Sequence, residues 1–265
     1  MAATEIADRV HRFQHVRYGP YRSLHIRKAE VALKKGDLGS ALASAVEARK
    51  FDPGNPSSAA VVREIRERVN SELPQVEAEE IVQSVRSIDG WFSDADALLL
   101  ARCVSGAPHS AARLVVEIGS YKGRSTTLIG LTVKKLGLPL RIITIDPHVG
   151  YPFGDQSDTH DALMSNLRRF DLLGHVEVRR ARSLDVRIDE QVALAFIDGM
   201  HDPESVSRDV GHLLDKIAPS GLIALHDYSD HFPGVIATAR ILLEDPAYKP
   251  VGLEEKFLVV RKLGA

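Results

Sequence analysis

From about residue 112 onward, short apolar runs alternate with helical stretches, and this rhythm constrains the fold more than any other feature of the chain. Continuous apolar runs of five or six residues are typical of strands that are buried on both faces of a parallel sheet. The helical stretches between them supply the crossovers that such a sheet needs. The predicted strands are Leu114–Ile118, Leu140–Ile145, His175–Arg179, Val192–Ile197, Gly221–Leu225 and Phe257–Val260, and the predicted helices are Ser125–Lys135, His160–Phe170 and Pro203–Ile217.

The composition is that of a soluble globular protein and excludes several classes of partner. Hydrophobic residues make up 44% and charged residues 26% of the 265 residues, with a formal net charge of −2. This balance gives no electrostatic reason to expect nucleic acid or an anionic membrane as a partner. The first residues lack the uninterrupted apolar core of a secretory signal, and no stretch approaches the length of a membrane span. We therefore expect a cytoplasmic protein, with the single cysteine, Cys103, as a buried thiol.

Residues 1–85 have a different, purely helical rhythm. The segment GDLGSALASAVEARKFDPGNP (36–56) places small and apolar residues at helical spacing and ends in an Asp-Pro-Gly cluster that stops a helix. It resembles one tetratricopeptide-type helical hairpin, and a further helix is predicted at Ser58–Leu73. A single hairpin of this kind cannot bury its own face. We expect it to pack on the domain formed by residues 86–265 or on a partner subunit, which would make the protein a homo-oligomer.

The first predicted strand of the sheet runs into EIGSYKGRS (117–125) and then directly into a helix. Gly119 and Gly123 permit a tight turn and remove side chains where a ligand meets the backbone. The helix N-terminus offers free N–H groups to a carboxylate, and Glu117 could accept from an ammonium, directly or through water. A ligand with an amino-acid tail, such as S-adenosylmethionine, requires both functions. The spacing is GxxxG and not the GxGxxG of nicotinamide enzymes, which argues against a pyrophosphate ligand.

Polar side chains also follow the second and third predicted strands. In sheets of this kind, ligands bind beyond the carboxyl ends of the strands. Asp146 could accept two hydrogen bonds from a ribose diol, and the loop that contains Ser183 could line an adenine ring. An acid in this place is shared with dinucleotide-binding folds, so it supports a nucleoside ligand without selecting one.

The fourth and fifth predicted strands end in the residues that most suggest catalysis. FIDGMH (196–201) places Asp198 and His201 three residues apart on a glycine-containing turn, and LHDY (225–228) places Asp227 at a strand terminus beside His226. The two aspartates would face each other across the same edge of the sheet. Oxygen ligands so placed suit Mg²⁺, which keeps several waters and takes only one or two carboxylates from the protein.

Residues 88–262 resemble the class I S-adenosylmethionine-dependent O-methyltransferases. The likeness is strongest to the branch of macrolide-sugar (macrocin and mycinamicin type) methyltransferases and cephalosporin-hydroxylase-like proteins. It implies a Rossmann-like α/β fold with a seven-stranded, mostly parallel sheet, helices on both faces, a reversed last strand at Phe257–Val260, and the helical appendage before it. The matching segments are GWF (90–92), VVEIGSYKGRST (115–126), ITIDP (143–147), FIDGMH (196–201) and GLIALHDY (221–228).

The resemblance also implies roles for individual residues. Asp198 and Asp227 would bind a divalent metal, and His201 would act as general base together with Asp198 in catalysis. For Trp91, the only tryptophan, the default expectation is a core or interdomain packing role, and the resemblance implies the alternative of a place near the methionine end of the cofactor. The residues expected to bind S-adenosylmethionine are Glu117, Gly119, Ser120, Tyr121, Gly123, Ser125, Asp146, Ser183, Asp198 and Trp91.

Two departures from the family pattern bear on the metal. His226 stands where the sugar methyltransferases often have an acid, and the usual DGDHSY reads DGMHDP. We expect His226 to be a third metal ligand beside Asp198 and Asp227. Two carboxylates and a histidine form a softer set than three carboxylates, so the site could bind Mg²⁺ weakly, prefer Mn²⁺ or work without metal. His201 could alternatively only cap the following helix.

The expected reaction is transfer of a methyl group to a hydroxyl of a small molecule, such as a sugar or a glycosylated metabolite. The acceptor would be selected by the loops Val149–Thr159 and Ser229–Val235, which are polar and aromatic, as carbohydrate-binding loops often are. Two alternatives remain from the sequence: a fold relative that performs other chemistry, such as hydroxylation, and a non-catalytic protein that has kept the cofactor turn.

Overall fold

The computed structural model describes residues 24–51, 56–150, 157–254 and 256–264. The chain divides into two compact units, Met1–Val69 and Asn70–Ala265, and each is described by itself. The division falls earlier than the boundary predicted after residue 85, because α4 (Glu79–Val85) buries Ile81, Val82 and Val85 in the core of the second unit. Among the helices of the described residues, none is both long and apolar enough to span a membrane.

The described part of the first unit is helical, as the cadence of residues 36–56 predicts. Residues 24–34 form a helix, a turn follows at Gly36, and α2 (Leu38–Phe51) and α3 (Pro56–Asn70) complete the unit. Asp37 caps α2 by accepting a hydrogen bond from the Ser40 backbone N–H at 3.0 Å. Small side chains allow the helices to approach closely. The residues that are at most 1% exposed here are Ala29, Ala41, Leu42, Ala45, Ala48, Ile65 and Val69.

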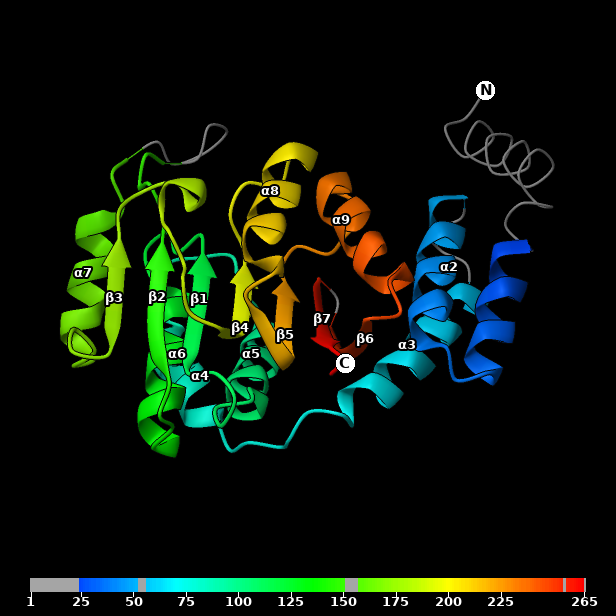
Figure 1. Ribbon diagram of the computed structural model, residues 1–265, viewed down its shortest axis with the longest axis horizontal. Coiled ribbons are helices and arrows are strands. Elements are labelled where there is room, and N and C mark those ends of the chain that lie inside the picture. The colour runs from blue at the N-terminus through cyan, green and yellow to red at the C-terminus, as the bar shows by residue number, and fades with distance from the viewer. Residues whose placement is uncertain (1–23, 52–55, 151–156, 255, 265) are drawn as a thin grey trace, which may run out of the picture. The chain divides into compact units, whose positions relative to one another are not determined.

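The second unit is built on a seven-stranded sheet with helices on both faces (Figure 1). Its strand order is β3-β2-β1-β4-β5-β7-β6. β7 runs opposite to the other six strands, so its pairs with β5 and β6 are antiparallel and the remaining pairs are parallel. This confirms the predicted fold class, including the reversed last strand. The strands are β1 (Leu114–Ile118), β2 (Arg141–Ile145), β3 (Val176–Arg179), β4 (Val192–Ile197), β5 (Ile217–Leu225), β6 (Tyr248–Glu254) and β7 (Phe257–Lys262).

The sequence pattern located five strands well but missed β6 and the start of β5. Pro250 lies inside β6 and the pairing with β7 shifts register between Pro250 and Gly252, so the segment lacks a continuous apolar run. In β5, the exposed pair Pro219 and Ser220 interrupts the run, and the pairing with β4 shifts in the same place. The predicted helix Pro203–Ile217 therefore ends earlier, at Leu214.

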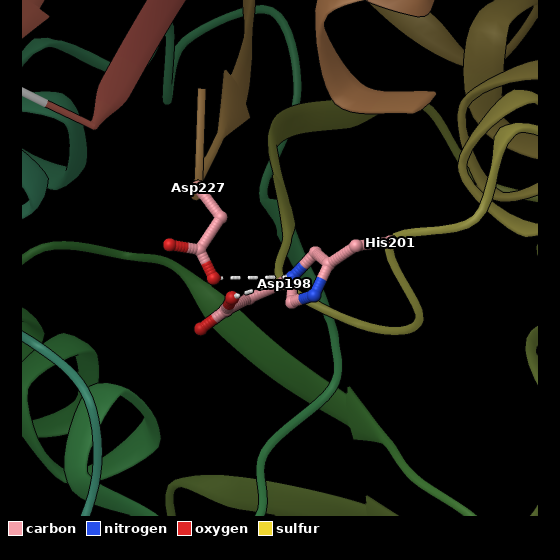
Figure 2. A group of neighbouring side chains, drawn as sticks. All are labelled: Asp198, His201 and Asp227. Carbon is pink, nitrogen blue, oxygen red and sulfur yellow. Dashed lines mark ion pairs between the residues drawn. The ribbon is translucent and has the colours of Figure 1, made fainter. Parts of the chain in front are cut away.

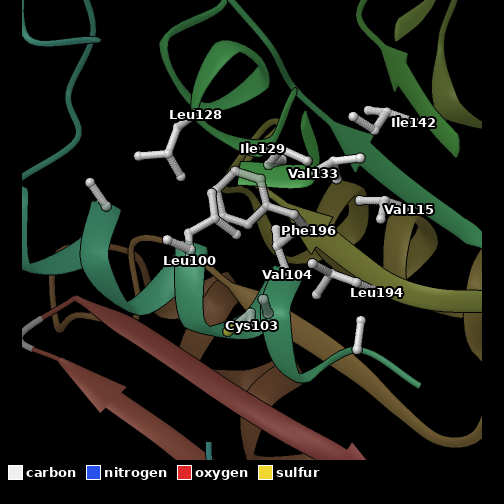
Figure 3. Packing of buried hydrophobic residues seen from close by; sticks show 14 of the residues in the cluster. Leu100, Cys103, Val104, Val115, Leu128, Ile129, Val133, Ile142, Leu194 and Phe196 are labelled. Atoms are coloured by element: carbon white, nitrogen blue, oxygen red, sulfur yellow. The ribbon is translucent and has the colours of Figure 1, made fainter. Parts of the chain in front are cut away.

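A hydrophobic core cluster packs helices against the sheet, and Figure 3 shows part of it. Along β4, Leu194 and Phe196 belong to this core and their neighbours Ala195 and Ile197 do not, as the alternation of side chains along a strand requires. Cys103 lies fully buried in the same core, as expected, and burial raises the pKa of its thiol to about 12. The helices that contribute to it are α4, α5 (Asp94–Gly106), α6 (Arg124–Leu136) and α7 (His160–Arg169).

The opposite face of the sheet is covered by α8 (Pro203–Leu214) and α9 (Pro233–Glu244), which pack against each other and contact β4 and β6. The crossovers deliver the end of every parallel strand to one edge of the sheet, which we call the carboxyl edge. β1, β2, β4 and β5 end there at Ile118, Ile145, Ile197 and Leu225, the last pairs of their registers. Every predicted functional residue except Trp91 lies within or directly after a strand or turn of this edge.

Candidate active site

The turn after β1 has two positions that only glycine can occupy. Gly119 and Gly123 have φ angles of +87° and +89°, in the left-handed region that side chains disfavour. A Cβ at Gly119 would lie 2.2 Å from the backbone oxygen of Asp198, and one at Gly123 would lie 2.4 Å from Leu163 Cδ1. The turn after β1 is therefore packed directly against the turn after β4. This contact brings the predicted cofactor turn and the predicted catalytic turn together.

Asp146 fixes the shape of the cofactor turn. Its Oδ2 accepts hydrogen bonds from the backbone N–H groups of Ser120 and Tyr121 at 2.8 and 2.9 Å, and its Oδ1 accepts one from His148 at 2.7 Å. The side chain is still 16% exposed, and Oδ1, which accepts only one of these bonds, keeps a second lone pair. Asp146 can thus hold the turn and accept from a ribose at the same time. The Ser120 hydroxyl beside it is buried without a hydrogen-bond partner in the described part of the chain.

Glu117 does not lie where an ammonium could reach it. Its side chain is 0% exposed, and its carboxylate accepts from the hydroxyls of Ser125, Thr126 and Thr144 at 2.5–2.6 Å. Burial raises the pKa of Glu117 to about 7, against the lowering effect of these three hydrogen bonds. The prediction that Glu117 contacts the cofactor therefore needs correction, because the carboxylate is enclosed. It ties the first turn of α6 to β2, and the Ser125 hydroxyl is used in this bond.

Trp91 lies over the cofactor turn. Its ring centroid is 5.0 Å from that of Tyr121, and the side chain is 69% exposed. Arg124 holds this segment by donating from Nη1 to the backbone oxygen of Gly90 at 3.2 Å. An exposed tryptophan is more typical of a binding surface than of a core. A packing role in the interior does not fit this exposure.

Three side chains with left-handed backbone mark the same edge of the sheet. Tyr121, His148 and Asp227 have φ angles of +47°, +53° and +55°, and they follow β1, β2 and β5. Strained backbone of this kind is concentrated at functional sites, where the surrounding structure enforces it. Among the described residues, Asp171 after α7 and Ser220 within β5 also have positive φ, so three of the five non-glycine residues of this kind lie at this edge.

Asp198, His201 and Asp227 form a cluster at the ends of β4 and β5 (Figure 2). The His201 Nε2 atom lies 3.3 Å from Asp227 Oδ2 and 3.7 Å from Asp198 Oδ1. One ligand atom from each residue falls within 4.8 Å of the others, and all three side chains are partly exposed. The ring nitrogens of His201 make no hydrogen bond within the described residues. The ring of Phe232 fixes the orientation of His201, with the centroids 4.4 Å apart.

His226 lies behind this cluster and is not one of its exposed ligands, which corrects its prediction as a metal ligand. It is 2% exposed, with Nδ1 3.0 Å from Asp198 Oδ1 and Nε2 3.6 Å from Asp96 Oδ2. The rings of Phe92, Phe196 and Phe257 surround it at centroid distances of 5.0–6.3 Å. His201 takes its place in the group of possible metal ligands.

The neighbouring His226 has a lowering effect on the pKa values of both Asp198 and Asp227. Burial by itself would lower the pKa of this imidazole, but the charge of Asp198 and the hydrogen bonds to Asp198 and Asp96 raise it to about 10. Burial would raise the pKa of Asp198, but His226 and His201 hold it below its ordinary value. For Asp227, burial raises the pKa and Asp198 adds to this, so the pKa lies above its ordinary value although His226 opposes the shift. Of the two histidines, His226 contributes most to the lowered pKa of Asp198.

Two residues of the site had no role in the sequence analysis. Ser93 caps α5 by accepting from the backbone N–H of Asp96, and its hydroxyl donates to Asp96 Oδ2 at 2.6 Å. Only the fold brings Asp96 to His226. The spacing Ser93-x-x-Asp96 is a capping box and could have located the helix start. Asp209 on α8 accepts a hydrogen bond from the hydroxyl of Ser183, in the 3₁₀ turn η1 (Ser183–Asp185). No local pattern reveals that contact.

Comparisons with known proteins agree with this arrangement. Residues 116–228 match the family model described as a methyltransferase domain. The structure is similar to that of the O-methyltransferase NovP, with a TM-score of 0.57, 16% identity, and coverage of 78% of this chain and all of NovP. It is also similar to the O-methyltransferase TomG from Streptomyces achromogenes, solved in complex with SAM (TM-score 0.50, 18% identity, 75% and 99% coverage). A third similar structure is cofactor-bound Rv0187 from MTB (0.50, 17%, 82% and 94%). At these identities the structural likeness shows a shared fold.

Proposed function

We propose that the chain is an S-adenosylmethionine-dependent O-methyltransferase that acts on a hydroxyl of a small molecule. The observation that carries this proposal is the direct contact between a glycine turn of the donor-binding kind and the Asp198–His201–Asp227 cluster, through the close approach of Gly119 to Asp198. The match of residues 116–228 to a methyltransferase domain supports it. The likeness in fold to the O-methyltransferase NovP, with a TM-score of 0.57, supports it as well.

The donor would lie along the carboxyl edge of the sheet. Its amino-acid tail would meet the backbone of Gly119–Gly123 and the orphan hydroxyl of Ser120, and Trp91 and Tyr121 would cover the sulfonium end. Asp146 would accept from the ribose, and Ser183 would line the adenine. Glu117 and Ser125 would not contact the donor. Their hydrogen bond, together with the one that Glu117 accepts from β2, fixes the first turn of α6 relative to β2.

Methyl transfer requires an acceptor oxygen in line with the sulfonium methyl group and a base for its proton. Alignment can contribute about 7–11 kcal/mol, and a positioned base typically adds about 10²–10⁴-fold. His201 suits the second role because both ring nitrogens are free of hydrogen bonds within the described residues. The imidazolium that forms would be stabilised by Asp227 and Asp198, which lie 3.3 and 3.7 Å from its Nε2.

The cluster also fits a divalent metal. The carboxylates of Asp198 and Asp227 form an oxygen donor pair for Mn²⁺ or Mg²⁺, and His201, within 4.8 Å of both, would be a third ligand only where it does not serve as the base. Asp198 and Asp227 would hold the ion, which when bound would lower the pKa of the acceptor hydroxyl. His226 lies 3.0 Å from Asp198 and 3.9 Å from Asp227, so Asp198 would be shared between this imidazole and the ion. We infer that the site binds a metal weakly.

The acceptor that we propose is a saccharide or glycosylated metabolite. The described loop Ser229–Val235 supports this choice, because it presents the exposed His231 and the partly exposed ring of Phe232 next to His201. The predicted acceptor residues Phe153, Gly154 and Asp155 lie outside the described residues. Self-association and cytoplasmic location stay predictions, and sedimentation of the full chain would test the first.

A hydroxylase with a two-histidine, one-carboxylate iron site is the alternative from a different class. It would need His201, His226 and Asp227 to bind one ion, but His226 is 2% exposed and already lies between Asp96 and Asp198. The observation that favours methyl transfer over this alternative is therefore the enclosure of His226.

Calorimetry with S-adenosylmethionine, with added Mg²⁺ and after chelation, tests the proposal, followed by a screen of saccharides and glycosides with a labelled methyl donor. We expect binding of the donor with and without Mg²⁺ and labelled product from at least one glycoside. Failure to bind the donor would contradict the proposal outright. Donor binding without product from any acceptor would favour the non-catalytic alternative.

A further inference from the structure

The segment that follows β3 is not fixed by apolar packing. No residue of η1 (Ser183–Asp185) is buried, and Leu184 at its centre is 51% exposed. The nearest buried apolar side chain that follows it is Ile188, which is 5% exposed. Within residues 183–186, polar contacts therefore set the position of the chain.

Two side chains of α8 hold this segment at both ends. The hydroxyl of Ser183 donates a hydrogen bond to Asp209 Oδ1, and His212 Nε2 donates to the backbone oxygen of Val186 at 2.9 Å. Asp209 and His212 are three residues apart and hence lie on the same face of the helix. The two bonds bracket η1, one at its first residue and one just beyond its last.

Asp209 has a second neighbour at the carboxyl edge. A Cβ on Gly199 would lie 3.1 Å from Asp209 Oδ2, so the carboxylate is packed against the turn that carries Asp198 and His201. Asp209 is only 7% exposed, and burial raises its pKa, against the lowering effect of the bond from Ser183. Burial of a carboxylate is costly unless its hydrogen bonds are made. The bond to Ser183 is thus a strong constraint on where the segment after β3 lies.

We propose that Asp209 and His212 are positioning residues for the methyl donor: they hold residues 183–186 in place from α8, and so set Ser183 against the adenine of S-adenosylmethionine. This inference rests on the proposed function, since it presumes that the donor binds along the carboxyl edge. Neither side chain needs to touch the donor. Because α8 begins directly after the turn of Asp198 and His201, the same helix positions the adenine end of the donor and the reacting centre.

Calorimetry with S-adenosylhomocysteine and with 5′-methylthioadenosine, which lacks the amino-acid tail, tests this inference on the full chain. We expect Asp209→Ala and His212→Ala each to weaken both ligands about 10-fold, the size of one lost hydrogen bond. Asp209→Asn should stay within about 3-fold of the wild type, because the amide oxygen still accepts from Ser183. Arg208→Ala, which removes an exposed ion pair with Glu204 on the same helix, is the matched control and should change neither affinity.

The pathway of the effect is tested in a Ser183→Ala background. There, Asp209→Ala should cause no further loss, because the residue acts through the Ser183 hydroxyl. An equal loss in both backgrounds would overturn the inference. If Asp209→Ala does not fold, the other two variants decide: wild-type affinity in His212→Ala as well as in Asp209→Asn would overturn it. A loss for S-adenosylhomocysteine without one for 5′-methylthioadenosine would also overturn it. Failure of the wild type to bind either ligand would instead contradict the proposed function.

Discussion

The donor turn and the reacting centre use carboxylates in opposite ways. Glu117 and Asp146, at the donor turn, each accept three hydrogen bonds from the protein, and Glu117 is fully enclosed. Asp227, at the reacting centre, has only imidazoles at ion-pair distance, and His201 makes no hydrogen bond among the described residues. Acceptors that are already hydrogen-bonded rigidify a structure, and only the lone pairs that remain, such as one on Asp146 Oδ1 and those of Asp227, are available to a ligand. The donor turn is therefore preorganised in the free protein, whereas the polar contacts of the reacting centre are completed when the ligands bind.

The largest effect is expected at the reacting centre. His201→Ala should lower turnover about 10²–10⁴-fold, because it removes the base, and it should leave donor affinity unchanged. The rate of labelled methyl transfer to the best glycoside of the screen, with calorimetry on the same preparation, measures both quantities. His175→Ala, at an exposed position on the surface, is the control. Full turnover by His201→Ala would remove the proposed base.

Glu117 should show the cost of an enclosed carboxylate as a dependence of stability on pH. Its pKa rises from 4.5 to about 7 in the folded chain, so the folded state binds a proton that the unfolded state releases between these values. The contribution to stability is complete below about pH 4.5 and is lost as the pH rises through about 7, a loss of roughly 3 kcal/mol. Urea unfolding at pH 5 and pH 8 measures it. Glu117→Gln cannot ionise and should lose less stability over this range; an identical pH profile would contradict the account.

We expect Asp146 to determine the affinity for the donor and not the rate of methyl transfer. Asp146→Ala leaves two backbone N–H groups of the turn without their acceptor and removes the proposed ribose contact, so donor affinity should fall about 100-fold. Calorimetry with S-adenosylhomocysteine gives the number. Asp161→Ala, at an exposed position on α7, serves as the matched control. If Asp146→Ala binds like that control, the donor turn does not depend on its carboxylate.

The smallest effect is expected behind the reacting centre, at the cap of α5. Ser93→Ala removes the capping hydroxyl and should cost about 1 kcal/mol in the free energy of unfolding. Donor affinity and turnover should stay unchanged, because Asp96 keeps its position beside His226. Chemical denaturation together with the glycoside assay tests both. A variant that keeps its stability but loses turnover would show that the capping box acts on the site directly.

Much of this contrast could be predicted from the sequence. Continuous apolar runs located β1, β2 and β4, and the rule that ligands bind at strand ends then brought Asp146, Asp198 and Asp227 to one edge. The enclosure of Glu117 could not be predicted, because its three hydroxyl partners come from α6 and β2 and are set by the register of the sheet.

His226 shows the same limit. Its sequence neighbours suggest a metal ligand, but its role depends on Asp96, which the capped start of α5 delivers from a distant part of the chain. β6 was missed for a different reason, since Pro250 and the register shift beside it remove the periodic signal. The residues that touch through long-range packing are the ones that local patterns miss.

Titration of the chain with S-adenosylmethionine is the measurement that tests the central claim most directly, with a glycine variant on each side of α6. Wild type and Gly137→Ala should bind the donor at one site: alanine at Gly137, where φ is +60°, strains the backbone as it does at Gly119, but its Cβ meets nothing within 4 Å. Gly119→Ala should not bind, because its Cβ would lie 2.2 Å from the Asp198 backbone oxygen and would force the donor turn away from the reacting centre. Equal binding by Gly119→Ala and wild type, or no binding by the wild type, would contradict the account.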